Sequence, residues 1–506
     1  MGKSQQSIAS APVGARSPPD RWSTLRRVAP LILSLALACG DHDDHGVGPG
    51  HATTHFVSPA GLSGNDGSAA HPWDLVTALA GAGGAVQAGD TVWLHGGTYV
   101  GDFRTSLSGA PGRPIVFRQF PGEHAVLDGG LRLQSGSDVT FWGFEIMQSN
   151  PLATANLPTL ETHAPRSRFI NLVIHDAGQQ GITFWDEAVD AEIYGCIVYN
   201  NGTHPNRDHG VYVHNTAGTK LIQDNVFFDN LAYGIHVFGD SADPVQRNVH
   251  VQGNVVFNNG TISSTYPAKG NILIGGNTPA AGMQVTDNML YFGGREGVNL
   301  GLGFSAQNQD LIATGNYIRG GGTALKVSRW SQLALEHNTL SGPARMVDVV
   351  GVPAGVTWDN NVYFRDPADT AWHVDSVAYS LPLWSAATGL GETDVALLNA
   401  PADPRVFVRA NKYEPGRALI VIFNWPRAGS VAVDVSGVLV SGSRYEVHNV
   451  QNPLGPAVAG GTWTAGTISI PMTGLDPPAP LGRTTPLPSR TAPDFDAFVL
   501  TSTPPQ

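Results

Sequence analysis

The chain has 506 residues, a formal charge of −12 and only 14% charged residues, with 61 glycines and 36 prolines. This length accommodates two or three domains, and the composition is typical of short strands separated by many turns. The negative charge argues against nucleic acid as a partner, because phosphate binding needs basic surface. With only two cysteines, Cys39 and Cys196, a disulfide framework is excluded as the stabilising device.

The first 54 residues predict export. Arg21, Arg26 and Arg27 precede a short apolar run, residues 28–38, that ends in small residues directly before Cys39. This pattern resembles a bacterial lipoprotein signal peptide over residues 1–38, with Cys39 taking the lipid; an ordinary secretory peptide cleaved nearby is the alternative. The run is too short to span a membrane. We therefore expect an exported protein that faces the periplasm or cell surface, is anchored only by its lipid, and has residues 39–54 as a tether.

The next segment predicts a cap and the first coils of a solenoid. Leu75, Ala78, Leu79 and Ala82 share one helical face, suited to covering an open end of stacked strands. The stretches GDTVWLHGGTY, AVLDGG and SGSDVTFWGFEI follow, at residues 89–99, 125–130 and 135–146. Together these features resemble the pectate-lyase-like family of carbohydrate-active right-handed parallel β-helix proteins. The resemblance covers roughly residues 55–365 and implies an extracellular fold that acts on or binds polysaccharide.

A slot that is usually asparagine recurs through the middle of the chain between short strand-like apolar pairs. It falls at Asn171, Cys196, Asn225, Asn254, Asn288, Asn316, Asn338 and Asn360. Elastic intervals of 22–34 residues indicate stacked coils whose insertions project from one face. Asparagine side chains stacked at a coil corner can hydrogen-bond to one another along the axis. We predict a right-handed parallel β-helix over residues 55–368, taking the hand from the crossover preference of parallel strands.

The last third of the chain changes character. Residues 369–402 have little repeat character and are expected to form a connector. Residues 403–506 contain alternating strands at regular spacing with turn signals, which favours an antiparallel β-sandwich domain. A module that packs against the solenoid and a sugar-binding module are both consistent with this pattern. The predicted fold class is therefore all-β: a capped parallel β-helix followed by a β-sandwich.

A second strand recurs in each coil and predicts the site. Its inward positions are apolar, so the residue between them faces outward, and equivalent residues in adjacent coils lie about 4.8 Å apart. Titratable and aromatic side chains that gather on one such strip, roughly 20 Å long, indicate a binding or catalytic groove. The side chains expected there are Trp185, Asp208, His209, Tyr212, His214, Tyr233, His236, Lys269, Arg295, Glu296, Asn299 and Lys326.

The residue types favour β-elimination from an acidic polysaccharide. In that reaction a cation neutralises the uronate carboxylate, a base removes the adjacent proton, and an acid protonates the leaving oxygen. The predicted catalytic residues are Lys269 and Arg295 as carboxylate receptors, His209 or His236 as base, and Tyr212 as acid. The remaining side chains are predicted to bind substrate: Asp208, His214, Tyr233, Glu296, Asn299, Lys326 and Trp185.

Two other kinds of function stay open at this point. An inverting glycoside hydrolase would use Asp208 and Glu296, although the expected coil register separates them by about 14 Å. A non-catalytic glycan-binding or structural protein is the third possibility. The sequence establishes no cofactor. Calcium is the candidate, because four carboxylates follow the second strand, but solvated turns are the preferred explanation for them: Asp186, Glu187, Asp240 and Asp243. We expect a monomer whose partner is a polysaccharide.

Overall fold

The computed structural model describes residues 52–263, 269–294, 296–342, 344–352, 354–482 and 485–505. Cys39, most of the predicted tether and Arg295 lie outside these described residues. From His51 onward the chain forms one compact unit. In the described ranges, every helix is too short or too polar to cross a bilayer.

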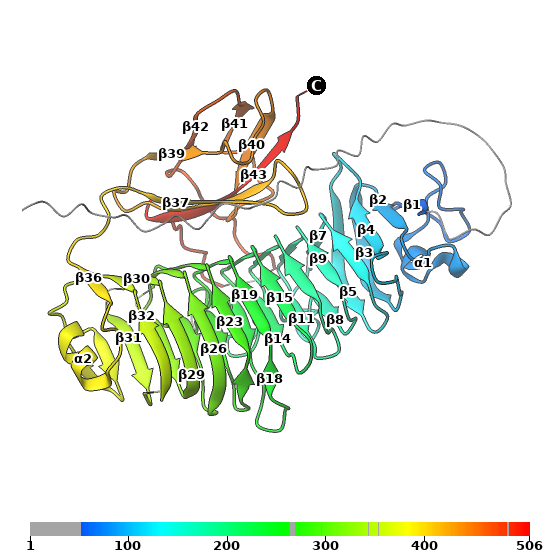
Figure 1. Ribbon diagram of the computed structural model, residues 1–506. Helices are drawn as coiled ribbons and strands as arrows, with labels where there is room; N and C mark the ends of the chain where they lie inside the picture. The colour runs from blue at the N-terminus through cyan, green and yellow to red at the C-terminus, as the bar shows by residue number, and fades with distance from the viewer. Residues whose placement is uncertain are drawn as a thin grey trace, which may run out of the picture. The chain divides into compact units, whose positions relative to one another are not determined.

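The unit is a parallel β-solenoid in which each coil contributes three strands (Figure 1). The first strands of the coils form a 12-stranded parallel sheet among the described residues. They are β1 (Thr54–Val57), β2 (Thr91–Leu94), β4 (Ile115–Gln119), β6 (Val139–Trp142), β9 (Arg168–Ile170), β12 (Glu192–Tyr194), β15 (Lys220–Gln223), β19 (Val249–Gln252), β23 (Met283–Thr286), β26 (Asn308–Thr314), β29 (Trp330–Glu336) and β32 (Gly355–Asp359).

The second strands form a stack that begins with two long strands spanning this stack and the next. It consists of β3 (Gly97–Thr105), β5 (Ala125–Leu133), β7 (Glu145–Met147), β10 (Val173–His175), β13 (Ile197–Tyr199), β16 (Val226–Phe228), β20 (Val255–Phe257), β24 (Met289–Phe292), β27 (Tyr317–Gly320), β30 (Thr339–Ser341), β33 (Val362–Phe364) and β36 (Val395–Leu397).

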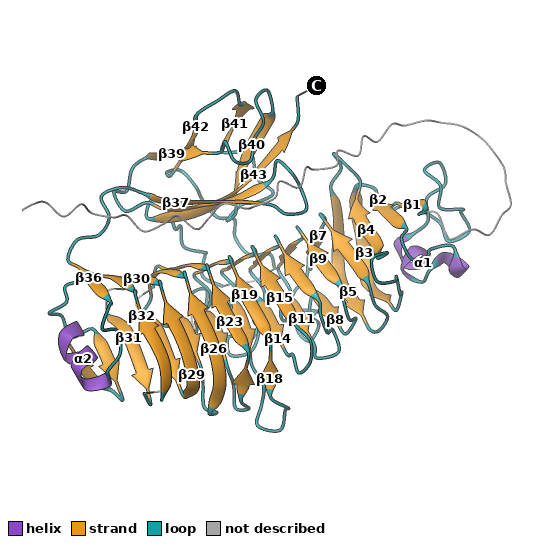
Figure 2. Cartoon of the chain, in the orientation of Figure 1, coloured by secondary structure: helices purple, strands orange, loops and turns teal. Residues whose placement is uncertain are grey.

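The third strands form the stack on which the predicted site lies. They are β8 (Leu160–Thr162), β11 (Ile182–Phe184), β14 (Val211–Val213), β17 (Ile235–Val237), β21 (Gly270–Ile274), β25 (Val298–Leu302), β28 (Thr323–Ser328), β31 (Arg345–Val350) and β34 (Trp372–Val374), the last extended by the antiparallel β35 (Val377–Tyr379). A short pair, β18 (Gln246–Arg247) and β22 (Ala280–Ala281), lies in the connections. Figure 2 shows how closely strand follows strand along the axis.

A buried asparagine ladder fills the corner between the first and second strands, as predicted. Each side-chain amide donates to the carbonyl oxygen of the next at 2.9–3.0 Å, from Asn225 through Asn254, Asn288, Asn316 and Asn338 to Asn361. The predicted slots at Asn171 and Asn360 are wrong by one residue. Both have a positive φ, of 52° and 58°, and stand one position earlier, in a turn that favours Gly, Asn or Asp.

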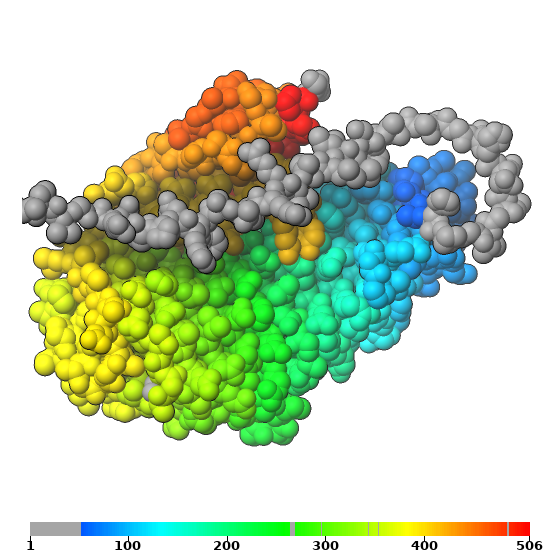
Figure 3. Space-filling view, in the orientation of Figure 1, coloured from blue at the N-terminus to red at the C-terminus, as the bar shows by residue number. Residues whose placement is uncertain are grey.

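Both ends of the solenoid are covered. At the start, the short helix α1 (Leu75–Leu79) buries Leu75, Ala78 and Leu79, and Thr105 donates to the Leu79 carbonyl oxygen at 2.9 Å. At the other end, α2 (Leu381–Thr388) buries Leu381 and Trp384. The expected connector over 369–402 therefore does not describe this segment, because it supplies β34, β36 and a capping helix. Between the caps the coils pack continuously, from cyan to yellow in Figure 3.

The C-terminal region forms two antiparallel sheets. A five-stranded sheet has the order β37 (Arg405–Ala410), β38 (Ala418–Phe423), β43 (Phe495–Thr503), β40 (Arg444–Asn449) and β41 (Ala459–Thr462). A second sheet pairs β39 (Ser430–Asp434) with β42 (Thr467–Pro471), and apolar residues of both sheets share one core. The five-stranded sheet also packs its other face on the second-strand stack, where Phe495 stacks on Tyr291 at 4.7 Å.

Candidate active site

The outward-facing side chains of the third strands form one continuous row, here called the outer row. Their neighbours Ile182, Phe184, Val211 and Val213 point into the core, so the alternating residues point outward. Strand pairing aligns the row in the order Arg132, Glu161, Thr183, Tyr212, His236, Leu273, Gly301, Lys326 and Asp348. The predicted juxtaposition of Tyr212 and His236 is confirmed.

His209 and His236 form a buried hydrogen-bonded pair. The backbone N–H of Tyr233 donates to His209 Nδ1 at 3.2 Å, so the proton of neutral His209 sits on Nε2. That N–H donates to His236 Nδ1 at 2.8 Å, which places the proton of His236 on Nε2. Burial lowers the pKa of His209 to about 3 and the pKa of His236 well below its usual value. Both rings are therefore neutral near pH 7.

This geometry corrects the predicted base. Both nitrogens of His209 are already engaged, so His209 cannot accept a substrate proton, and the prediction is wrong for it. His236 holds its proton on Nε2, which has no hydrogen-bond partner among the described residues although the side chain is buried. His236 is therefore a neutral hydrogen-bond donor rather than a base. Tyr233 packs its ring on His236 at 4.9 Å and helps to enclose the pair.

Tyr212 and His214 form a second pair next to the first. The Tyr212 hydroxyl and His214 Nε2 are 2.8 Å apart. Burial raises the pKa of Tyr212, and the charges of Asp240, Asp243 and Asp186 raise it further. Burial also lowers the pKa of His214. Tyr212 is therefore protonated and His214 neutral near pH 7, so the phenol donates its proton toward the imidazole.

Two carboxylates flank His214. Asp186 Oδ2 lies 3.9 Å from Nδ1, and Asp243 Oδ2 lies 4.0 Å from Nε2. An imidazolium at His214 would be stabilised by both charges. The sequence suggested these carboxylates only as calcium ligands or solvated turns. In the part of the chain that the structure describes, no group of three His, Cys, Asp or Glu side chains is placed to hold a metal ion, so calcium stays a prediction.

Lys220 is a buried support for these turns that sequence analysis did not identify. Its side chain lies inside the solenoid, and its ammonium donates to the carbonyl oxygens of Phe184, Trp185 and His214, the residues at the ends of β11 and β14. Burial lowers the pKa of Lys220 to about 7. The lysine thereby connects the two turns that carry Trp185 and His214. A lysine in a position that faces the core was the available signal.

Basic side chains lie on the C-terminal side of these pairs. Lys269, half-buried just before β21, is close enough for its charge to lower the pKa of both His209 and His236. Lys326 is in the outer row as predicted, three strand spacings beyond His236. Arg295, the other predicted carboxylate receptor, lies outside the described residues, so its role stays a prediction.

Three predicted substrate-binding residues are not placed as predicted. Asn299 is fully buried, because β25 pairs two residues out of the expected register and places Asn299 beside Asn271 in a second asparagine ladder. The same shift places Val298, not Glu296, at the position equivalent to Tyr233, and leaves Glu296 exposed before the strand. Asp208 is fully buried, and its Oδ2 accepts the backbone N–H groups of residues 203 and 204.

The outer row also extends further toward the N-terminus than predicted. The indole N–H of Trp185 donates to Glu161 Oε1 at 2.8 Å, and Arg132 Nε lies 3.9 Å from Glu161 Oε2. Trp185 packs against His214 at 5.5 Å between ring centres. This network joins Arg132 and Glu161 to the Tyr212–His214 pair. Arg132 and Glu161 lie in coils with less regular repeats, so the repeating strand pattern in the sequence did not identify them.

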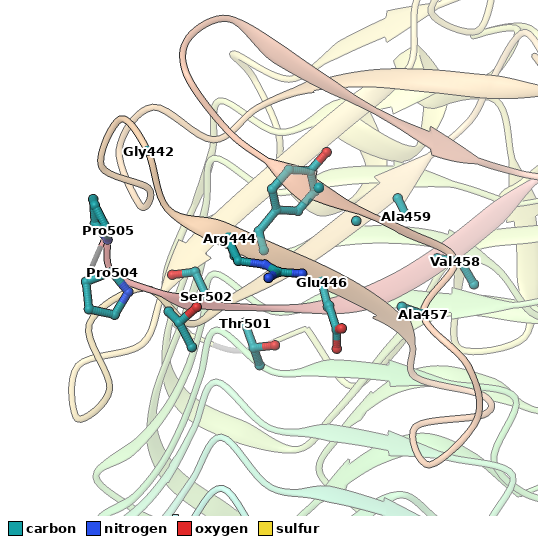
Figure 4. A pocket seen from close by; sticks show the side chains of 14 residues that line it. Gly442, Arg444, Glu446, Ala457, Val458, Ala459, Thr501, Ser502, Pro504 and Pro505 are labelled. Atoms are coloured by element: carbon teal, nitrogen blue, oxygen red, sulfur yellow. The ribbon is translucent and has the colours of Figure 1, made fainter. Parts of the chain in front are cut away.

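A separate concavity of about 1100 Å³ lies on the C-terminal domain (Figure 4). It is lined by Arg444 and Glu446 of β40, by residues 457–461 around β41, and by the end of β43. Tyr445 also lines it, and the remaining lining side chains include no histidine, lysine or aspartate. The outer row, with the histidines that pair with its Tyr212 and His236, is therefore the better candidate for chemistry.

Comparison with protein families gives one match. The model of the family described as Pel9A-like, right handed beta helix region, matches residues 55–315, about half of the chain. This range contains both histidine pairs and Lys269. Among curated proteins, the uncharacterized protein YwoF of Bacillus subtilis (strain 168) is 26% identical over 170 residues, which cover 34% of this chain and 27% of that protein. The chain thus matches about a quarter of that relative's length.

Solved structures with a similar fold include a pectate lyase and an alginate lyase. The pectate lyase Pel9A has a TM-score of 0.44 and 17% identity, covering 62% of this chain and 79% of that chain. An alginate lyase from Paenibacillus sp. str. FPU-7 has a TM-score of 0.38 and 18% identity, covering 64% of this chain and 99% of that chain.

Proposed function

The chain belongs to the Pel9A-like right-handed β-helix family, and on this premise we propose that it is a polysaccharide lyase that cleaves a uronate-containing glycan by β-elimination. Pel9A, after which the family is named, is a pectate lyase. The observation that carries the proposal is the 2.8 Å contact between Tyr212 and His214 next to His236 Nε2–H, a buried donor without a partner among the described residues. Such a set can move a proton and stabilise an anion.

Tyr212 and His214 supply the proton transfers. The C5 proton of the uronate moves to Tyr212 Oη while the phenolic proton moves to His214 Nε2. The electrons of the C5–H bond form the C4–C5 double bond, and the C4–O bond breaks with its electron pair going to the leaving oxygen. Tyr212 then protonates that oxygen and His214 returns its proton to Tyr212. Asp186 and Asp243 stabilise the transient imidazolium, since each lies within 4.0 Å of a ring nitrogen.

His236 and Lys269 supply the electrophilic contribution. The proton to be removed is acidic only when the neighbouring carboxylate is neutralised or hydrogen-bonded, because negative charge develops there in the transition state. His236 Nε2–H is a buried donor without a hydrogen-bond partner among the described residues, on the strand adjacent to Tyr212, and Lys269 contributes a positive charge close by. Arg295 is retained as a further carboxylate receptor in this proposal.

The test is digestion of pectate, alginate, chondroitin, hyaluronan and ulvan, each with and without calcium, with ultraviolet absorbance and reducing ends recorded together. A lyase produces an unsaturated, absorbing product with each new reducing end. We expect Tyr212→Phe to lower kcat by about 10²- to 10⁴-fold, the usual range for loss of an acid–base group, with the fold unchanged.

Tyr379→Phe is the matched control, because Tyr379 lies in β35 at the far end of the solenoid and should keep wild-type activity. Full absorbance from Tyr212→Phe would contradict the assignment of the pair. Reducing ends without absorbance would replace elimination with hydrolysis.

Hydrolysis is the second candidate, supported by a different pair of carboxylates from the predicted one. Asp208 is buried and Glu296 is out of register, but Asp186 and Asp243 lie on either side of a single imidazole ring. Their separation is then no more than about 10 Å, compatible with the carboxyl pairs of glycosidases. Under this alternative, Asp186→Asn and Asp243→Asn each abolish the release of reducing ends.

The proposal includes export and lipid anchoring through Cys39, on the basis of the signal-like residues that precede it. Expression of the full chain in a bacterial host, followed by membrane fractionation, tests this. The wild-type chain should be recovered with membranes and incorporate a labelled fatty acid, and Cys39→Ala should not incorporate the label. Equal labelling of the two chains, or no labelling of either, would remove the anchor from the proposal.

A further inference from the structure

The half of the outer row that precedes Tyr212 contains a buried hydroxyl group without a hydrogen-bond partner among the described residues. Thr183 occupies the rung between Glu161 and Tyr212, and its side chain is only 3% exposed. Its hydroxyl has no hydrogen-bond partner among the described residues. A buried hydroxyl without a partner costs free energy, and a ligand hydroxyl placed over it would recover that cost.

An aromatic surface stands beside this hydroxyl. Trp185 follows Thr183 in the same coil, and its indole is held in place by Glu161, by stacking on His163 at 6.0 Å and by an edge contact with Tyr212. The ring is half-buried, so part of it faces outward. A fixed aromatic face next to a hydroxyl suits the apolar face of a sugar ring together with one of its hydroxyl groups.

The charges around this half of the row disfavour an acidic sugar. Four carboxylates lie here, against the guanidinium groups of Arg104 and Arg132: those of Asp102, Glu161, Asp186 and Glu187. Arg132 is itself already flanked by Asp102 Oδ1 at 3.2 Å and Glu161 Oε2 at 3.9 Å. On the other side of Tyr212, Lys269 and Lys326 provide positive charge alongside the carboxylates of Asp240, Asp243 and Asp348, the last of which is paired with Arg345.

We propose that the outer row on the N-terminal side of Tyr212 is a subsite for an uncharged sugar residue, held by Thr183 and Trp185. This inference rests on the proposed function and narrows it: the substrate is a copolymer in which uronate alternates with an uncharged sugar, rather than a polyuronate. The uronate lies over Tyr212, His236 and Lys269, and the uncharged residue lies over Thr183.

The probes are unsulfated chondroitin and hyaluronan, in which uronate alternates with an uncharged N-acetylhexosamine, and the polyuronates pectate and alginate. Binding is measured by retardation of Tyr212→Phe in native gels containing each polymer, which needs no turnover. We expect retardation by at least one copolymer and about tenfold weaker binding of both polyuronates. Adding Thr183→Val should weaken copolymer binding by about 3- to 10-fold, the usual effect of one lost hydrogen bond.

Two further variants sharpen the test. Glu161→Gln keeps an acceptor for the Trp185 indole but removes one negative charge, so polyuronate binding should increase several-fold while copolymer binding stays the same. Thr286→Val, on the first-strand sheet, is the matched control and should change neither. The melting temperature of Thr183→Val should not fall, because its hydroxyl makes no hydrogen bond among the described residues.

The outcomes separate this inference from the proposed function. Equal retardation by copolymers and polyuronates, or retardation by neither, would overturn the uncharged subsite. So would wild-type copolymer binding by the Thr183→Val variant. Failure of the lyase proposal has a different signature: no ultraviolet absorbance from the wild-type protein, whether or not the copolymers retard it.

Discussion

Among single residues, desolvation without a hydrogen-bonded carboxylate decides which chemistry is available. His209, His214 and His236 all have lowered pKa values because their rings are buried, and all are neutral near pH 7. His175 shows the opposite result from a similar degree of burial. Burial alone would lower its pKa, but hydrogen bonds to Asp176 and Glu145, at 2.7 and 2.9 Å, outweigh that effect and raise it to about 8. Directly hydrogen-bonded carboxylates, not burial itself, separate His175 from the other three histidines.

The buried His209 predicts loss of stability in acid. Its folded pKa is about 3 and its unfolded pKa about 6.5, so below pH 6.5 the unfolded chain binds a proton that the folded chain does not. The free energy of unfolding should therefore fall as the pH decreases from 6.5 toward 3, by roughly 2–3 kcal/mol at pH 4.5 from this group. Denaturant unfolding at pH 7 and pH 4.5 measures this.

Between pH 7 and pH 4.5, the free energy of unfolding of His209→Gln should fall by roughly 2–3 kcal/mol less than that of the wild type. His71→Gln is the control, since the His71 side chain is 68% exposed, and it should keep the wild-type difference. An identical pH dependence in His209→Gln would rule out the buried neutral histidine.

Substitution of Lys220 should lower both the stability of the protein and the activity of the candidate site. In Lys220→Met, the carbonyl oxygens of Trp185 and His214 lose their donor inside the solenoid. We expect a loss of about 2–4 kcal/mol in the free energy of unfolding, since an unsatisfied buried carbonyl costs about 1–3 kcal/mol. Kinetics below the melting transition should show a lower kcat with little change in KM. A stable variant with wild-type kcat would show that Lys220 does not position these turns.

Among secondary-structure elements, the strands are very short, and the corner ladders compensate for this. Most second and third strands in the middle coils have three residues, too few to specify a register by side-chain pattern alone. The two asparagine ladders supply register, because each amide must meet its equivalent in the next coil. One ladder runs from Asn225 to Asn361 at the corner between the first and second strands. The other runs from Asn201 to Asn299 at the corner between the second and third strands.

Substitution of Asn288 tests how much the asparagine ladder contributes to the free energy of unfolding. Its side chain is fully buried, donates to Val251 and Asn316, and accepts from Asn254. Asn288→Ala should lower the free energy of unfolding by about 2–4 kcal/mol, because it leaves several buried polar atoms unpaired. Asn150→Ala, at an exposed turn, should change the melting temperature little. Comparable melting temperatures for the two variants would argue against the ladder as a source of stability.

At the scale of the whole molecule, the C-terminal domain completes the solenoid by covering its second-strand stack. The outward side chains of this stack are large and mostly aromatic, and include His175, Tyr199, Phe228 and Phe257, whose rings stack at 4.8–4.9 Å. Phe495 and Trp425 of the C-terminal domain contact the same face, and Trp425 donates to the Tyr317 hydroxyl at 2.8 Å. Packing against the solenoid is thus one established role of this domain.

This interface predicts cooperative unfolding of the two regions. Phe495 is fully buried between Phe257, Tyr291 and Phe423. Phe495→Ala should destabilise the protein by about 3–5 kcal/mol and split a single calorimetric transition into two. Phe304→Ala is the comparison, because Phe304 is 50% exposed and should leave one transition near the wild-type temperature. A single transition in Phe495→Ala would show that the regions are coupled by other contacts.

The sequence by itself determined the repeating coil, the N-terminal cap, the antiparallel C-terminal region and most of the outer row, because these depend on local alternation and on recurring asparagine. Only the tertiary structure decided the positions that depend on register. Asn171 and Asn360 stand one residue before the ladder, and β25 is shifted by two, which moves Asn299 inside and Glu296 away. The physical reason is that hydrogen bonds between coils, not the sequence within a coil, select the register. The tautomers of His209 and His236 were also beyond the sequence, since a backbone N–H from the next coil, that of Tyr233, sets them.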